Sequence, residues 1–181
     1  MIDGPLATGK PIGRRMTRPM QKLREETLAF VESASLKISE SGLVRESPAR
    51  VFGAFTDQTS WPKWFPLMRR CEWMTPSEAG LGATREVFLV GLGTFREKFI
   101  AWEEERRFAF TITESSSPFA DAVCEDFRFQ PAEGGKYTHI DWTLAADPRL
   151  FGKVTRPVVE FTMRRVFRKS GILLERYLRD S

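Results

Sequence analysis

From residue 69 to residue 146, apolar and polar side chains alternate with a period of two in a series of short segments. This pattern predicts six strands, at residues 69–74, 84–90, 94–102, 107–113, 122–130 and 137–146. The links between these segments are short and rich in turn residues. Strands joined by such links are antiparallel neighbours, because a parallel crossover needs about a dozen residues or more. We therefore expect one antiparallel sheet.

The segments on either side of this series predict one further strand and three helices. Residues 36–44 alternate modestly, which indicates a first strand. Ser47 followed by Pro48 is typical of a helix start, because a capping hydroxyl precedes a proline at the first helical position. The SWPKWFP segment that follows suits a single helical turn that lays aromatic rings against the core. From Pro157 onward, an apolar stripe beside basic residues predicts a long amphipathic helix that closes the chain.

The N-terminal region predicts a tail and a short helix. Residues 1–17 mix glycine, proline and arginine with little periodicity, and we expect them to be poorly ordered. Near-helical spacing then predicts a short amphipathic helix that packs on the body or on a partner subunit, so a homodimer through this helix is one expectation. The residues that carry this spacing are Met20, Leu23, Thr27, Phe30 and Val31. We divide the chain into this segment, residues 1–35, and a single domain, residues 36–181.

The turn at Gly91-Leu92 decides which side chains face the interior of the sheet. If this turn pairs Val90 with Gly93, then Glu86 faces Glu97 directly, and the period of two places them on one face. With plausible registers for the later links, the apolar face collects Phe88, Val90, Phe95, Phe99, Phe108, Phe110, Ile112, Val123, Phe127, Ile140, Trp142 and Leu144. The wet face collects Arg85, Arg96, Lys98, Asp126, Arg128 and Asp141, with Val87, Ile100 and Trp102 as apolar exceptions.

Three carboxylates, Glu86, Glu97 and Glu125, fall on the apolar face. Such a position is costly unless the group is protonated, paired with a donor or solvated inside a cavity. Burial and a like charge between Glu86 and Glu97 would raise the pKa of at least one of them. A neutral carboxyl in an apolar pocket can donate a hydrogen bond to a ligand carbonyl or act as a general acid or base. The alternative is a purely structural role at the cavity rim, paired with arginine or tyrosine.

Composition and charge exclude several classes of protein. Hydrophobic residues make up 41% and charged residues 29%, as in ordinary globular domains. No apolar run suits a membrane span or a secretory signal, so we expect a cytoplasmic protein. The basic excess lies in residues 1–24 and 149–181, which leaves a net acidic body and argues against a nucleic-acid groove. Cys71 and Cys124 lie far apart, and we expect reduced, buried thiols.

No cofactor or metal is expected. His139 is the only histidine and falls on the wet face, and no cysteine cluster accompanies it. The GPLATGKP segment fits a phosphate-loop pattern, but proline replaces the residue that binds magnesium and no strand can precede it.

Four segments resemble the polyketide cyclase/dehydrase and START-related superfamily, often called SRPBCC. They are SPARVFGAFTDQTSWPKWFP, GLGATRE, FREKFIAWEEERRFAF and HIDWTLAADP, and the resemblance spans about residues 36–178. It implies an α+β helix-grip fold, in which a curved antiparallel sheet of about six or seven strands wraps around a long C-terminal helix. It further implies a cavity between sheet and helix for lipids, polyketides, isoprenoid quinones or other apolar molecules. No catalytic set is shared across the superfamily, so none is transferred to this chain.

Two functions from different classes are open at this point. The first is the binding or transport of a small hydrophobic molecule, and the second is a cyclase or dehydratase that uses Glu86, Glu97 or Glu125 for proton transfer. A third possibility is that the basic tail and terminal helix recruit a protein or a membrane surface. The predicted ligand-binding residues are Trp64, Phe65, Glu86, Phe88, Phe95, Glu97, Phe99, Phe110, Ile112, Val123, Glu125, Phe127, Trp142, Met163 and Phe167.

Overall fold

A computed structural model of the chain describes residues 18–74, 79–150 and 154–181. The strands are β1 (Gln21–Lys22), β2 (Leu36–Val44), β3 (Met68–Trp73), β4 (Thr84–Leu89), β5 (Gly93–Glu103), β6 (Arg107–Ser115), β7 (Ala120–Ala132) and β8 (Tyr137–Pro148). The helices are α1 (Leu28–Ser33), α2 (Pro48–Thr56), α3 (Trp61–Trp64), a 3-10 turn (Glu133–Gly135) and α5 (Arg156–Asp180). The fold is the expected α+β helix-grip.

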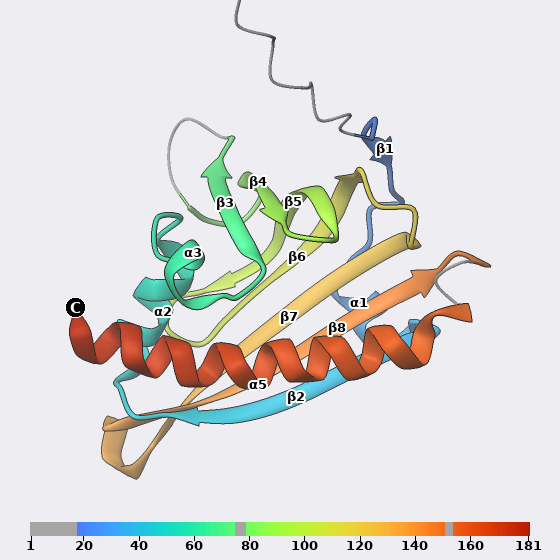
Figure 1. Cartoon of the computed structure of the whole chain (residues 1–181). Helices are drawn as coiled ribbons and strands as arrows, with labels where there is room; N and C mark the ends of the chain where they lie inside the picture. Colours follow the sequence, from blue (N-terminus) through green and yellow to red (C-terminus); the bar gives the residue numbers. More distant parts are fainter. Residues whose placement is uncertain (1–17, 75–78, 151–153) are drawn as a thin grey trace, which may run out of the picture.

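One antiparallel sheet curves around the long helix α5. The strand order is β2-β8-β7-β6-β5-β4-β3, and β1 pairs with β6 away from this path. Figure 1 shows α5 lying across the concave side of the sheet, while α2 and α3 close the end near its C-terminus. The interior therefore lies between sheet and helix, where most of the buried apolar side chains form one cluster.

Helices α2 and α3 fill one end of this interior with aromatic rings. Ser47 caps α2 by accepting a hydrogen bond from the backbone N–H of Arg50 at 3.5 Å, as its sequence predicts. The rings of Trp61 and Trp64 lie 4.4 Å apart between centroids, and Phe55 packs 4.8 Å from Trp64. The indole N–H of Trp61 donates to the backbone carbonyl of Phe55 at 2.8 Å. These rings occupy the end of the interior near the C-terminus of α5.

The N-terminal helix is shorter than expected. Residues 21–22 form a strand that pairs with Ser115 and Glu114 of β6, and the helix begins only at Leu28. Its apolar side chains, Phe30 and Val31, are buried on the outer face of the sheet against Ala122, Cys124 and Ala145. The helix thus packs on the body of the chain, and the homodimer stays a prediction. The expected tail at residues 1–17 lies outside the described residues.

The register between β4 and β5 differs from our prediction by one residue. Leu89, and not Val90, pairs with Gly93, because the connecting loop has three residues and Gly91 adopts a φ of +81°. Since side chains alternate, this shift exchanges the two faces of β4. Arg85 and Val87 point into the interior and are buried, whereas the predicted inward residues of β4 point outward.

The other strand pairs keep the predicted faces. Phe99 pairs with Phe110 and Glu97 with Ile112, as predicted. The β5–β6 register has an irregularity between Phe99 and Ala101, and beyond it Trp102 points into the core. The ring of Trp102 packs against that of Phe52, with 5.6 Å between the centroids. The predicted placement of Trp102 on the wet face was therefore wrong. In β7 and β8, Phe127 pairs with Trp142 and not with Ile140, a shift of two residues that preserves the face.

Both cysteines are buried free thiols, as expected. Burial raises the pKa of Cys71 and of Cys124 to about 11, which keeps both thiols protonated at neutral pH. Across the described ranges, no helix is both long enough and apolar enough to cross a bilayer.

Candidate functional site: an apolar cavity with a buried carboxyl

A small apolar cavity lies between the sheet and the first turns of α5. Its volume is about 150 Å³. Apolar side chains supply most of its wall, with two glutamates and two serines as the polar exceptions: Leu23, Leu36, Leu89, Leu92, Phe95, Glu97, Ile112, Ser115, Ser117, Phe119, Ala120, Val123, Glu125, Leu144, Ala146, Pro148, Val159 and Met163. No residue of α2 or α3 lines the cavity.

Glu125 of β7 places a carboxyl group in the wall of this cavity. The indole N–H of Trp142, on the neighbouring strand β8, donates a hydrogen bond to Oε2 of Glu125 at 2.7 Å. Burial raises the pKa of Glu125 to about 7, the Trp142 bond opposes the rise, and the nearby charge of Glu97 adds to it. At neutral pH the carboxyl is therefore divided between its neutral and ionised forms. The neutral form can donate a hydrogen bond into the cavity.

Glu97 of β5 forms the second carboxyl, and it is paired. Nε of Arg85 lies 2.5 Å from Oε2 of Glu97, and both side chains are almost fully buried. The guanidinium also lies over the rings of Trp61 and Phe99, 4.9 and 5.2 Å from their centroids. Burial raises the pKa of Glu97, and Arg85 opposes that rise. Glu97 thus lines the cavity near Glu125 as one member of a buried ion pair.

Two serines supply the remaining polar groups. Oγ of Ser115 accepts a hydrogen bond from the backbone N–H of Ser117 at 2.9 Å. Oγ of Ser117 is buried and has no hydrogen-bond partner among the described residues. An unpaired buried hydroxyl of this kind costs about 1–3 kcal/mol.

Comparison with known proteins decides the family. The family described as "Polyketide cyclase / dehydrase and lipid transport" matches residues 35–178. The chain belongs to this family. An uncharacterised protein of Mycobacterium tuberculosis and one of Mycobacterium bovis are each 33% identical over 147 residues, which covers 78% of this chain and 86% of the relative.

Solved structures show the same fold. A START superfamily protein from Mycobacterium smegmatis matches with a TM-score of 0.66 at 16% identity, covering 80% of this chain and 97% of that one. A protein from Thermus thermophilus matches with a TM-score of 0.64 at 20% identity, covering 79% and 97%. These similarities agree with the helix-grip architecture of the polyketide cyclase / dehydrase and lipid transport family.

In this member of the family, the predicted site residues separate into four groups. The cavity brings together six of them: Phe95, Glu97, Ile112, Val123, Glu125 and Met163. The packed core beside it contains Phe65, Phe99, Phe110, Phe127 and Trp142, of which only Trp142 reaches a polar group of the cavity. Trp64 and Phe167 line a separate cleft of about 190 Å³ between β2 and α5.

The fourth group, Glu86 and Phe88, is a correction. The three-residue loop places both on the outer face, so they do not face the cavity. Glu86 binds Arg70 at 2.8 Å and Arg96 at 3.1 Å there, and it does not oppose Glu97. Arg85 takes the position expected for Glu86, and our sequence reasoning missed it because an arginine in an alternating strand is normally solvated.

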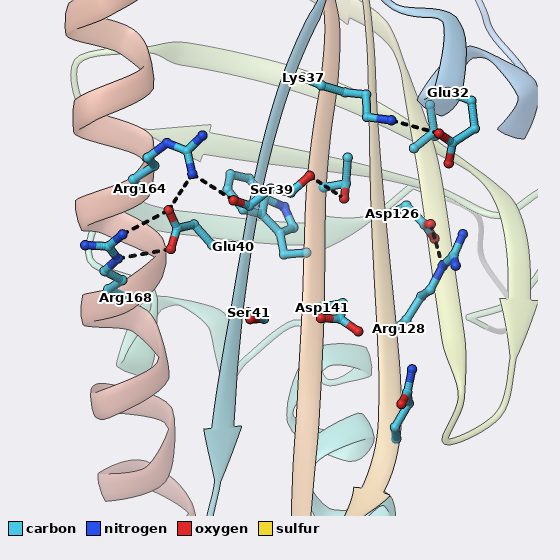
Figure 2. Close-up of a pocket in the computed structure, with 14 residues that line it drawn as sticks. Glu32, Lys37, Ser39, Glu40, Ser41, Asp126, Arg128, Asp141, Arg164 and Arg168 are labelled. Carbon is cyan, nitrogen blue, oxygen red and sulfur yellow. Dashed lines mark hydrogen bonds and ion pairs between the residues drawn. The ribbon is translucent and has the colours of Figure 1, made fainter.

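A larger polar groove lies on the outer face of β2, β8 and β7 (Figure 2), with a volume of about 600 Å³. Its charged side chains largely neutralise one another. Figure 2 shows Glu40 of β2 turned toward α5, where it binds Arg164 at 2.7 Å and Arg168 at 3.0 Å. Arg164 also donates to the backbone carbonyl of Ser39 at 2.9 Å. This cluster attaches the middle of α5 to the edge strand of the sheet.

We expect Glu40→Gln to destabilise the protein by about 1 kcal/mol at neutral pH, since one carboxylate serves two arginines. Hydrogen bonding from Arg168 is the main reason that the pKa of Glu40 is lowered. A lowered pKa contributes stability above the unfolded-state pKa and loses it as the pH falls through the folded-state pKa. The difference between the variant and the wild type should therefore shrink below about pH 4. Urea unfolding at several pH values measures it.

Glu160→Gln is the control, because Arg156, in the same helix and 2.6 Å away, is the only ion-pair partner of Glu160 among the described residues. That exposed pair should be worth about 0.3–0.5 kcal/mol. Equal losses from both substitutions would contradict the attachment of α5 through Glu40.

Proposed function

We propose that the protein binds a small apolar molecule with one hydrogen-bonding oxygen, which faces the carboxyl group of Glu125. The observation that supports this proposal is an apolar cavity whose wall holds a buried carboxyl with a pKa of about 7. In its neutral form this group donates a hydrogen bond to a ketone or aldehyde oxygen. The family description, which names both polyketide chemistry and lipid transport, supports a ligand of this kind.

The cavity volume limits the part of the ligand that is enclosed. A space of about 150 Å³ suits one aromatic ring, whereas pockets for drug-sized ligands range from about 300 to 1,000 Å³. The enclosed ligand is accordingly a single ring or the end of a longer chain.

Acetophenone and its hydrocarbon isostere α-methylstyrene are suitable probes, because they differ by one hydrogen-bond acceptor. At about pH 5.5, the neutral Glu125 should bind the ketone more tightly than the hydrocarbon. At about pH 8.5 the ionised carboxylate cannot donate, and ketone affinity should fall by up to about thirtyfold, while hydrocarbon affinity changes little. Calorimetric titration or ligand-observed NMR measures both affinities.

Glu125→Gln tests the role of the carboxyl directly. The amide keeps a donor at every pH, so the variant should bind acetophenone with little pH dependence. Failure of both probes to bind at either pH would overturn the proposal, as would an identical pH dependence for ketone and hydrocarbon.

Proton-transfer catalysis of the cyclase or dehydratase type is the second candidate. The pKa of Glu125 near 7 favours it, because a general acid or base works best when its pKa lies near the operating pH. With a poly-β-ketone substrate, Glu125→Gln should abolish turnover and leave the fold intact. Glu86→Gln is the matched control, because this carboxyl lies on the outer face. Full turnover by Glu125→Gln would exclude the mechanism.

A further inference from the structure

The outward side of α5 carries a stripe of exposed side chains, distinct from the apolar stripe of the same helix that faces the sheet. Val158, Phe161 and Ile172 are 68%, 64% and 70% exposed, although each is large and apolar. Of the nine exposed large apolar side chains in the described residues, these three lie on the single helix α5. Scattered exposed apolar residues are normal, but their concentration on one helix face is not. Such a concentration marks an interaction surface.

Basic side chains complete this face. Residues spaced three or four positions apart lie on the same side of a helix. Six residues of α5 follow this spacing, and we call them the outward stripe: Val158, Phe161, Arg165, Lys169, Ile172 and Arg176. Its three basic members have no ion pair among the described residues, and all three are exposed. The guanidinium of Arg165 lies 5.9 Å from the ring centroid of Phe161, so charge and apolar surface are contiguous.

The acidic residues of α5 stand beside this stripe and are already neutralised. Glu160 pairs with Arg156, Glu175 lies 3.9 Å from Arg45, and Asp180 lies 3.4 Å from Arg179. Glu160 and Glu175 are partly buried, whereas Asp180 at the end of the helix and the members of the outward stripe are exposed. Figure 1 shows that no other element of the described chain covers the outward side of α5. The face therefore presents apolar side chains and unpaired positive charge together.

We propose that the outward stripe of α5 docks on an anionic lipid surface. A helix with apolar and basic residues on one face lies in the plane of a bilayer interface, with the apolar groups inserted and the cations among the headgroups. Charge complementarity selects this partner, because the stripe contains three cations and no anion. The same first turns of α5 place Val159 and Met163 in the cavity wall, so docking brings the cavity beside the membrane. The proposal stands independently of the ligand proposed above.

Co-sedimentation with lipid vesicles tests this surface without any cavity ligand. The full chain should bind phosphatidylcholine vesicles that contain phosphatidylglycerol, bind neutral phosphatidylcholine vesicles weakly, and lose binding as salt rises from about 0.05 M to about 0.5 M. Arg165→Gln/Lys169→Gln should lower the partition coefficient by about thirtyfold. Phe161→Ser should lower it by about tenfold, because the inserted ring is lost.

Matched controls separate the stripe from overall charge and hydrophobicity. Arg106→Gln/Lys136→Gln removes the same charge from exposed positions elsewhere, and Leu81→Ser removes an apolar side chain that is 73% exposed. Both should bind anionic vesicles as the wild type does. Equal losses in the control and stripe variants would overturn the proposal.

Two further outcomes would also overturn it. Binding to immobilised polyglutamate without binding to anionic vesicles would assign the stripe to an acidic protein partner. Conversion of a dimer to a monomer by Phe161→Ser, seen by analytical ultracentrifugation without vesicles, would assign it to a second copy of this chain.

Discussion

Arg85→Met should destabilise the protein by about 3–5 kcal/mol, because it leaves the carboxylate of Glu97 buried without its partner. Both side chains of this pair are nearly inaccessible, and four aromatic rings surround the guanidinium. Without the arginine, Glu97 in the folded protein binds a proton, because an unpaired buried charge is costly. In the unfolded chain, the same carboxyl releases its proton as soon as the pH exceeds the ordinary pKa of a glutamate. The loss should consequently be larger at about pH 8 than at about pH 5. Urea unfolding at both pH values measures it.

The double variant Arg85→Met/Glu97→Leu shows whether the unpaired charge is the cause. Replacing a buried ion pair by apolar groups of similar size is often neutral, so the double variant should be more stable than Arg85→Met alone. Arg70→Met is the control, because Arg70 pairs with Glu72 and Glu86 on the outer face. This substitution should lower the free energy of unfolding by at most about 1 kcal/mol. A double variant no more stable than Arg85→Met would show that the lost packing of the arginine stem, and not the charge, dominates.

The position of Arg85 shows where prediction from sequence stops. Alternation located strands β2 to β8, because a period of two survives errors of one or two residues at the strand ends. The short links predicted which strands from β4 to β8 are neighbours, whereas the pairing of β2 with β8 and the short strand β1 were not predicted. It did not determine the length of the loop between β4 and β5. The pairing of Leu89 with Gly93 depends on the left-handed conformation of Gly91, which neighbouring glycines allow in more than one arrangement. The loop is one residue longer than predicted. As a result, Arg85 lies in the interior, where the prediction placed Glu86.

Prediction of the candidate site succeeded where the strand register was predicted with the correct face. Glu97 and Glu125 were placed correctly in the interior, because the registers of β5 with β6 and of β6 with β7 were predicted with the correct face. The division between packed core and cavity was not predictable, since alternation identifies the inward face but not the space above it. That division depends on how α2 and α3 fill one end with Phe55, Trp61 and Trp64. Ser117 lay in a segment whose composition predicted only a turn.

Glu125→Gln should be more stable than the wild type above pH 7 by up to about 3 kcal/mol, and nearly equal to it below about pH 4.5. The pKa of Glu125 is raised to about 7, chiefly by burial. Between about pH 4.5 and 7 the unfolded chain releases this proton while the folded chain keeps it, so the folded state loses stability as pH rises. Glutamine has no proton to release, and its amide oxygen can still accept the bond from Trp142. The stability difference, measured by urea unfolding from about pH 4 to 9, should open across this window and then level off.

Glu40→Gln provides a control of opposite sign, because the pKa of Glu40 is lowered and its carboxylate stabilises the folded state. That variant should be less stable than the wild type at neutral pH, whereas Glu125→Gln should be more stable. Parallel pH curves for the wild type and Glu125→Gln would mean that the carboxyl titrates as it does in the unfolded chain. A ligand carbonyl in the cavity would then meet an ionised carboxylate at neutral pH, which cannot donate a hydrogen bond to it. The pH curve of the empty protein therefore tests the donor on which ketone binding depends.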